Sequence, residues 1–207
     1  VKRRPVNCNT THYRANSSSV PGDPTEYVRY QLQKTSDKKK QSNWKGKEWG
    51  LKIDIFKTLF RNSNNYLYNK TNGICLGSRT GQEVVALQEC GVDKVIGIDL
   101  HEFPPYTING DIHNLKFKDN TFDLAFTNIL DHSLYPEKFA EEIYRVLKPE
   151  GILIIHIQHD VKQDKYTEVI IENLEGVEEL FDKFRVLEKR KIDSGIIAMN
   201  YEFIFRK

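Results

Sequence analysis

One stretch, residues 73–99, limits the folds open to this chain more than any other. It begins with a short apolar run, turns through Gly77–Gly81, and continues into a helical pattern that Gly91 ends as a C-terminal cap. A second apolar run, residues 95–98, leads directly to Asp99. A strand, a glycine turn, a helix and a strand that ends in an acid form the first half of a nucleotide-binding βαβ unit.

The residue types in this stretch suit a polar, nucleotide-like ligand. Gly77 and Gly81 let the backbone approach a ligand without a Cβ in between. The N-terminus of the following helix offers unpaired N–H groups, and Asp99 can accept both hydroxyl groups of a ribose. The turn reads G-x-x-x-G, so it matches neither the G-x-G-x-x-G of dinucleotide enzymes nor a P-loop.

This turn resembles the first motif of the class I S-adenosylmethionine-dependent methyltransferases, specifically the methyltransferase type 11 group. That motif reads [D/E]-x-G-x-G-x-G, and residues 75–81 keep two of its three glycines. Cys75 replaces the leading acid, Arg79 replaces the middle glycine, and Glu83 is a candidate substitute for the missing acid. The alternative is a tight turn that binds nothing. The residues of this region that the resemblance assigns to the cofactor are Gly77, Ser78, Arg79, Thr80, Gly81 and Glu83.

Two later segments extend the resemblance. In the resembled families an acid followed by an apolar residue contacts the adenine, and Asp111 and Ile112 match that position. Residues 122–127 resemble the fourth motif, F-D-hydrophobic-hydrophobic, and the segment around 147–155 resembles the family's next helix–turn–strand. The further residues that the resemblance assigns to the cofactor are Asp99, Leu100, Asp111, Ile112, Asn128 and Ile129.

The order of the predicted elements indicates an α/β protein. Strands and helices alternate from residue 73 to 155, which is typical of a parallel sheet with helices on both faces. The last two strands, 185–191 and 196–205, are joined by residues 193–195 into a hairpin, which we expect to be the only antiparallel pair. The resemblance implies a Rossmann-like, seven-stranded, mostly parallel sheet whose last strand is antiparallel, and the element count agrees with it.

We predict two regions along the chain, a flexible polar and basic segment over residues 1–43 and a methyltransferase domain over residues 44–207. Residues 1–24 are rich in Pro, Ser and Asn and lack periodicity, which is typical of a linker. Residues 26–34 are predicted to form a short helix. The lysine run 38–40 is interpreted as a solvated loop, or else as a contact for an acidic partner.

Apolar residues recur at helical spacing between positions 44 and 67, which predicts an amphipathic helix before the sheet. Packing on the sheet is its default role. In the resembled group, segments at this place often cover the cofactor, so Trp44 and Trp49 are candidates for a lid.

Charge is distributed unevenly along the chain. Residues 1–50 contain 11 Lys/Arg and 4 Asp/Glu, whereas the whole chain has a net charge of +2. This near-neutral total, without basic residues interleaved with stacking aromatics, argues against a nucleic-acid partner. No apolar run is long enough to span a membrane. The methyltransferase resemblance leads us to expect a small-molecule or glycan acceptor as the partner.

Two details keep the cellular location open. The only methionine is Met199, so we expect further sequence upstream of Val1. Three N-x-[ST] sequons occur, at Asn9, Asn16 and Asn69. A cytoplasmic location and a secretory lumen with an upstream anchor are both compatible with these observations.

Histidines follow the predicted strands. His101, His113, His132 and His156 each follow a parallel strand and His159 lies nearby, so all five are expected at the ligand-binding edge of the sheet. Methyl transfer needs a base only when the acceptor must lose a proton early. His132, with Asp131 beside it, is the candidate base, and the alternative is a loop histidine. No paired acidic signature accompanies the last two histidines, so we expect no metal.

The sequence thus predicts an S-adenosylmethionine-dependent methyltransferase that acts on an oxygen or nitrogen of a small molecule or glycan and releases S-adenosylhomocysteine. One alternative acceptor is an acidic polysaccharide in the secretory pathway, which the basic N-terminal segment and the sequons favour. A second alternative is a non-catalytic, methyltransferase-like binding domain, which Cys75 and Arg79 keep open.

Overall fold

The structure, a computed structural model, describes residues 13–15, 24–161 and 166–207 and is built around one seven-stranded sheet. The strands of this sheet are β2 (Asn72–Leu76), β3 (Lys94–Asp99), β4 (Thr107–Asn109), β5 (Phe122–Thr127), β6 (Leu147–Ile157), β8 (Arg185–Lys191) and β9 (Tyr201–Arg206). The helices are α1 (Pro24–Ser36), α2 (Lys38–Lys45), α3 (Lys47–Asn62), α4 (Asn64–Leu67), α5 (Gln82–Glu89), α6 (Pro136–Val146) and α7 (Glu175–Leu180).

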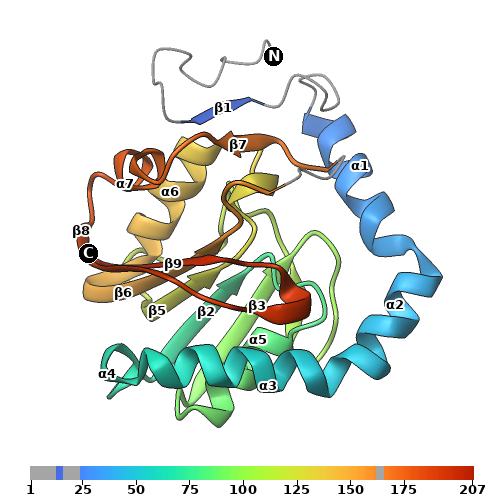
Figure 1. Cartoon of the computed structure of the whole chain (residues 1–207), viewed down its shortest axis with the longest axis horizontal. Helices are drawn as coiled ribbons and strands as arrows, with labels where there is room; N and C mark the ends of the chain where they lie inside the picture. Colours follow the sequence, from blue (N-terminus) through green and yellow to red (C-terminus); the bar gives the residue numbers. More distant parts are fainter. Residues whose placement is uncertain (1–12, 16–23, 162–165) are drawn as a thin grey trace.

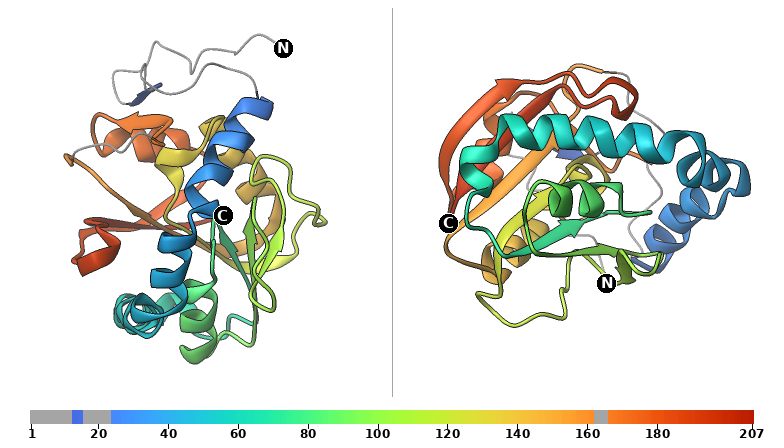
Figure 2. Two further views of the ribbon diagram at one scale, coloured as in Figure 1. Left: turned by 90° about the vertical axis from the view of Figure 1, so that its right-hand side faces the viewer. Right: turned by 90° about the horizontal axis from the view of Figure 1, so that it is seen from below.

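Helices cover both faces of this sheet. α3 and α5 lie on one face, and α6 and α7 on the other, while α1 and α2 rise from the start of α3 along one side (Figure 1). The view from below shows α3 and α5 side by side across the sheet (Figure 2). The predicted Rossmann-like α/β fold is confirmed.

The strand order is β4-β3-β2-β5-β6-β9-β8. β2 to β6 run parallel, and β9 runs antiparallel to both β6 and β8, so the predicted antiparallel last strand is confirmed. The hairpin is not the only antiparallel pair, because β9 lies between β6 and β8. A separate two-stranded antiparallel sheet pairs β1 (Tyr13–Ala15) with β7 (Val169–Ile171).

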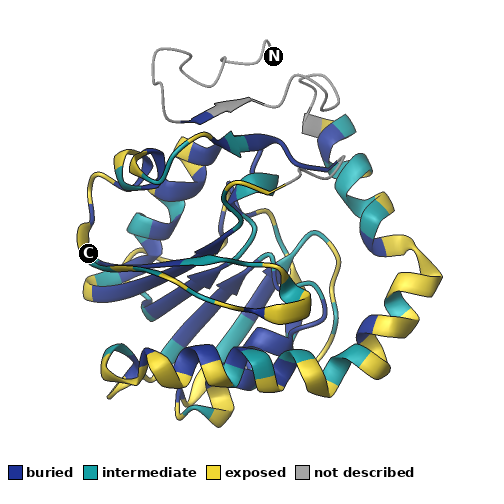
Figure 3. Ribbon diagram, in the orientation of Figure 1, coloured by how far each residue is buried: buried dark blue, intermediate teal, exposed yellow. Residues whose placement is uncertain are grey.

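Side chains alternate across the central strands and fill two separate cores. Ile74 and Leu76 of β2 pack in the core that contains Phe139 of α6, whereas Cys75 between them packs in the core that contains Phe56 of α3. The central strands are accordingly buried on both faces (Figure 3). This burial explains why they are nearly continuous apolar runs in the sequence.

The amphipathic pattern over residues 44–67 forms three helices instead of one. Gly46 separates α2 from α3, and a Cβ there would lie 2.8 Å from the carbonyl oxygen of Ser42. Ser63 separates α3 from α4. The predicted packing of this segment on the sheet is confirmed, since α3 buries Ile53, Phe56, Leu59 and Phe60.

Residues 24–43, which the sequence places in the N-terminal segment, form α1 and most of α2. The predicted short helix is confirmed. The predicted loop at the lysine run is wrong, because Oδ1 of Asp37 accepts the backbone N–H groups of Lys39 and Lys40 at 2.9 and 3.1 Å and caps α2. The linker predicted over residues 1–24, with its sequons at Asn9 and Asn16, lies almost wholly outside the described residues.

The last strand begins later than predicted. Residues 195–197 form a single 3-10 turn, η2 (Gly195–Ile197), and Ala198 adopts a left-handed conformation with φ of 64°. The hydroxyl of Ser194 donates to the carbonyl of Met199 at 2.9 Å, which stabilises this irregular backbone. Ile197 therefore lies off the sheet. No helix in the described ranges has both the length and the apolar character needed to cross a membrane.

Candidate functional site

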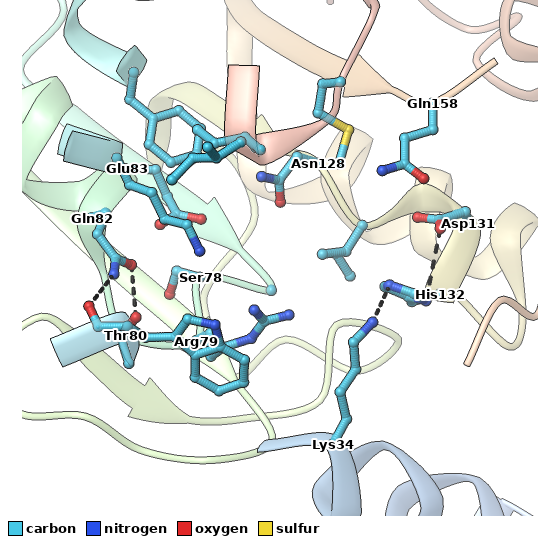
Figure 4. Close-up of a pocket in the computed structure, with 18 residues that line it drawn as sticks. Lys34, Ser78, Arg79, Thr80, Gln82, Glu83, Asn128, Asp131, His132 and Gln158 are labelled. Carbon is cyan, nitrogen blue, oxygen red and sulfur yellow. Dashed lines mark hydrogen bonds and ion pairs between the residues drawn. The ribbon is translucent and has the colours of Figure 1, made fainter. Parts of the chain in front are cut away.

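Two adjoining cavities lie at the carboxyl ends of the parallel strands, where α/β proteins bind ligands. Their volumes are about 240 Å³ and about 60 Å³. The side chains that line both are Lys34, Gly77, Arg79, Ile129 and His132. Figure 4 shows the larger cavity, with the glycine turn on one side and Asp131, His132 and Gln158 on the other.

The structure brings together every residue that the sequence assigned to the site except Gly81. Those in the larger cavity are Gly77, Ser78, Arg79, Thr80, Glu83, Asn128, Ile129, Asp131 and His132. The smaller cavity adds Asp99, Leu100, Asp111 and Ile112. Gly81 has a φ of 86°, and a Cβ there would lie 2.4 Å from Cβ of Tyr106. Gly81 is therefore required for packing at the start of α5.

Gly77 brings the backbone of the turn close to the opposite wall. Its φ is 77°, and a Cβ there would lie 2.3 Å from Cγ1 of Ile129. The backbone N–H of Gly77 donates to the carbonyl of Ile98 at 2.7 Å, which fixes the turn on β3. The hydroxyl of Ser78 is buried and hydrogen-bonds to that of Thr107 at 2.9 Å. The turn is thus held in place before any ligand binds.

Asp99 ends β3 beside the smaller cavity. Its Oδ2 accepts the backbone N–H of Arg79 at 2.9 Å, and its Oδ1 accepts that of His101 at 3.1 Å. A carboxylate oxygen can accept two hydrogen bonds, so each oxygen keeps a further acceptor position. The carboxylate is therefore oriented, and it can still accept the two hydroxyl groups of a ribose.

Asp111 lies next to a buried histidine. Its Oδ1 accepts the backbone N–H of His113 at 2.8 Å and the Nδ1–H of the same residue at 2.9 Å, and these bonds lower the pKa of Asp111. The Nε2 atom of His113 lies 2.9 Å from the hydroxyl of Ser133 and accepts the backbone N–H of Tyr135 at 3.3 Å. Asp111 is thus kept ionised beside Ile112.

Glu83 is buried in the first turn of α5 and lines the larger cavity. Burial raises its pKa to about 7, against a partial lowering by a backbone hydrogen bond and by the charge of Arg79. Burial of Cys75 raises the pKa of its thiol, and the nearby charge of Glu83 raises it further. Glu83 therefore places a carboxyl group close to the position where the motif's leading acid is missing.

We expect the stability of the protein to fall as the pH rises from about 4.5 to about 7, because the unfolded chain loses the Glu83 proton first. Glu83→Gln should remove this decrease, and its free energy of unfolding at pH 8 should exceed that of the wild type by roughly 3 kcal/mol. At pH 4 the variant and the wild type should be equally stable. Urea denaturation across this pH range measures the difference. Parallel pH profiles of the free energy of unfolding for the two proteins would contradict the raised pKa of Glu83.

His132 is held by two groups. The Lys34 ammonium, which can only donate, lies 2.9 Å from Nε2, and the carbonyl of Tyr166, which can only accept, lies 3.0 Å from Nδ1. The proton of the neutral ring is therefore on Nδ1. Oδ2 of Asp131 lies 3.8 Å from the same nitrogen. Nε2 is thus in the form that a general base requires, but Lys34 occupies it.

The other four histidines of this set line neither cavity, and the prediction that His156 follows its strand is wrong. His156 lies within β6, because this strand continues two residues beyond Ile155, and it is fully buried against Glu202 of β9. His113 supports Asp111. His101 is exposed, and the backbone of His159 is bound by the side chain of Asn200.

Several residues that line the cavities were missed by the sequence reasoning. One face of α1 contributes Tyr27, Gln31, Lys34 and Thr35, which recur at helical spacing. Most are polar, so no apolar periodicity marks this face. The hydroxyl of Tyr27 donates to the carbonyl of His132 at 2.8 Å, which fastens α1 to the site. The larger cavity adds Lys52, Phe56, Gln82, Gln158, Ile196, Ile197 and Met199.

The two tryptophans differ in their relation to the site. Trp44 lines the larger cavity, and its carbonyl accepts a hydrogen bond from Nε2 of Gln82 at 3.1 Å. Trp49 instead packs beside Phe103 and Tyr106. Only Trp44 is therefore placed where a lid residue would contact a ligand.

Comparisons with known proteins agree with this geometry. Residues 74–155 match the family model described as a methyltransferase domain. No curated protein sequence matches the chain. Solved structures do resemble it, although their low sequence identities mean that they inform on the fold alone.

Three solved structures, with TM-scores from 0.54 to 0.69, serve as examples. The 1,6-didemethyltoxoflavin-N1-methyltransferase of Burkholderia thailandensis, which contains 1,6-didemethyltoxoflavin and S-adenosylhomocysteine, is 15% identical with a TM-score of 0.69 over 94% of each chain. A SAM-dependent methyltransferase from Archaeoglobus fulgidus is 14% identical with a TM-score of 0.61, over 83% of this chain and 100% of the other. The [4+2]-cyclase SpnF is 16% identical with a TM-score of 0.54, over 70% and 80%.

The matched segment contains the glycine turn, Asp99, Asp111 and the strand ends that surround the two cavities. The sheet order and the helices on both faces extend the agreement beyond that segment. Residues 74–155 therefore match a methyltransferase domain, and the chain has a Rossmann-like methyltransferase fold.

Proposed function

We propose that this protein is an active methyltransferase that modifies an oxygen or nitrogen atom of a small molecule or glycan. The observation that supports this most strongly is the convergence of the ends of β2, β3 and β5 on two adjoining cavities. When bound, S-adenosylmethionine supplies a methyl group made electrophilic by its sulfonium. Methyl transfer is an in-line displacement, so the protein accelerates it mainly by positioning the reactants.

The residues present fit such a cofactor. Asp99 keeps one free acceptor position on each oxygen for the ribose, and Asp111 with Ile112 lines the smaller cavity where the adenine would bind. Gly77 lines the junction of the cavities, and the buried carboxyl group of Glu83 faces the larger one. We assign the nucleoside to the smaller cavity and the amino-acid end to the larger.

His132 and Asp131 are the proposed catalytic pair. The unprotonated Nε2 of His132 would accept a proton from the acceptor after the Lys34 ammonium moves away from it. The carboxylate of Asp131, 3.8 Å from Nδ1, would stabilise the resulting imidazolium. Gln158, Ile197 and Met199 line the same cavity and offer a mixed polar and apolar surface to a small acceptor.

The test is calorimetric titration of S-adenosylmethionine and S-adenosylhomocysteine into the wild type and Asp99→Ala. Loss of the ribose acceptor should weaken binding by roughly 1–3 kcal/mol, or about tenfold or more. Asp93→Ala is the matched control, because this exposed acid precedes the opposite end of β3 and lines neither cavity. Failure of the folded wild type to bind either compound would contradict the proposal. Binding without turnover in a screen of acceptors would favour the non-catalytic alternative.

A further inference from the structure

We infer that Arg79 is an anion-binding residue whose guanidinium holds a carboxylate group of the ligand in these cavities. The inference rests on the proposed function, since it assigns a role to the residue that replaces the middle glycine of the motif. The residue that departs from the motif would thus make a specific interaction with the ligand.

The backbone of Arg79 is the first observation. Its φ is 44°, in the left-handed region that glycine adopts freely and that a residue with a side chain rarely adopts. A glycine at this position would be unstrained. Strained backbone persists where the surrounding structure compensates for it, and it gathers at ligand-binding sites. The presence of an arginine here therefore points to a use for its side chain.

The position of the guanidinium is the second observation. Its central carbon lies 4.3 Å from the centre of the Trp44 ring, and Trp44 is buried. Gln82 fixes this ring by donating to the Trp44 carbonyl, and its own Oε1 accepts the hydroxyl of Thr80 at 2.7 Å. Stacking uses the face of the guanidinium and leaves the N–H groups at its edge free to donate. Figure 4 shows this side chain extending from the turn into the cavity.

The third observation is that the described part of the chain offers this guanidinium no hydrogen-bond acceptor. Asp99 accepts the backbone N–H of Arg79 and makes no ion pair with its side chain. By contrast, Arg145 pairs with Glu142 and Asp119. A half-buried cation in a ligand cavity without a carboxylate partner is a site for an anion from the ligand.

The other charged side chains around the cavities agree with this assignment. Lys34 and Arg79 line both cavities, so two cations lie where the cavities adjoin. Lys52 lies in the larger cavity and pairs with Glu48 at 2.7 Å. The acids that face the cavities are Glu83, Asp99, Asp111 and Asp131, of which Asp99 and Asp111 already accept hydrogen bonds from the chain. The planar guanidinium matches a carboxylate in a two-point interaction.

Two ligands can supply this carboxylate, the amino-acid end of the cofactor or the acceptor. The first arm of the test titrates S-adenosylhomocysteine and 5′-deoxy-5′-methylthioadenosine, which lacks the amino-acid end, into the wild type, Arg79→Gly and Arg79→Lys. Arg79→Gly should remain as stable as the wild type, because it relieves the left-handed strain. If the cofactor supplies the carboxylate, Arg79→Gly should weaken S-adenosylhomocysteine about tenfold or more and leave methylthioadenosine unchanged. Arg79→Lys should recover only part of the loss, because it keeps the charge without the planar fork.

The second arm uses Trp44 fluorescence in a Trp49→Phe background, where Trp44 is the only tryptophan. Benzoate is titrated with and without saturating S-adenosylhomocysteine. If the acceptor supplies the carboxylate, benzoate should give a saturable change in the presence of S-adenosylhomocysteine, and Arg79→Gly should abolish it. The inference is overturned if Arg79→Gly changes neither S-adenosylhomocysteine affinity nor the benzoate response. A wild type that binds neither adenosine compound would contradict the proposed function. In that case, a saturable benzoate response that Arg79→Gly abolishes would still support the role of Arg79, and the lack of such a response would overturn it.

Discussion

Glu202→Ala should destabilise the protein by about 3–5 kcal/mol, because it removes the carboxylate to which the buried partners of Glu202 are bonded. Oε2 of Glu202 accepts Nε2–H of His156 at 2.8 Å, and its Oε1 accepts the hydroxyl of Ser63 at 3.0 Å and pairs with Arg190. Nδ1 of His156 has no partner among the described residues, so the variant would leave the whole imidazole without hydrogen bonds in the core. The free energy of unfolding in urea measures the effect.

Glu188→Ala is the control for Glu202→Ala, because Glu188 pairs with the same guanidinium at 2.7 Å but is partly exposed. It should cost less than about 1 kcal/mol. Burial alone would raise the pKa of Glu202, but the hydrogen bond from His156 and the nearby charges lower it. This contribution to stability is therefore present above the ordinary glutamate pKa and lost as the pH falls through the lowered value. A cost for Glu202→Ala similar to that of Glu188→Ala would contradict the network.

Phe60→Ala should also cost about 3–5 kcal/mol, through lost burial and the cavity left behind. Phe60 is fully buried on the face of α3 that packs on the sheet, with its ring centre 5.0 Å from that of Phe126 and 5.9 Å from that of Phe56. Leu51→Ala on the same helix is the control, because Leu51 is 50% exposed and should change stability by less than about 0.5 kcal/mol. Equal urea midpoints for the two variants would show that α3 is not anchored through Phe60.

The parts of the fold and site that sequence reasoning found depend on local signals. β2 and β5 are short apolar runs, and each is followed at once by the residues that reach the cavities. Gly77 and Gly91 mark positive φ angles of 77° and 97°. Such signals lie within a few residues of one another, so one sequence is sufficient to identify them.

The parts that it missed depend on contacts between distant segments. His156 is buried because Glu202, 46 residues later, pairs with it across β6 and β9. The wall that α1 contributes is mostly polar and reaches His132 from Tyr27, 105 residues earlier. Neither pairing leaves a periodic pattern in the sequence, because the two partners of each pair are far apart along the chain and meet only when it folds.

The place of β9 between β6 and β8 has a consequence for synthesis of the protein on the ribosome. Until residues 201–206 have left the exit tunnel, the apolar strand β6 keeps one hydrogen-bonding edge unpaired. Such an edge is a template for pairing with other chains. The nascent chain therefore emerges with β2 to β6 already synthesised and one edge of β6 still unpaired. We expect chaperones that bind extended apolar segments to protect this intermediate until the last strand inserts.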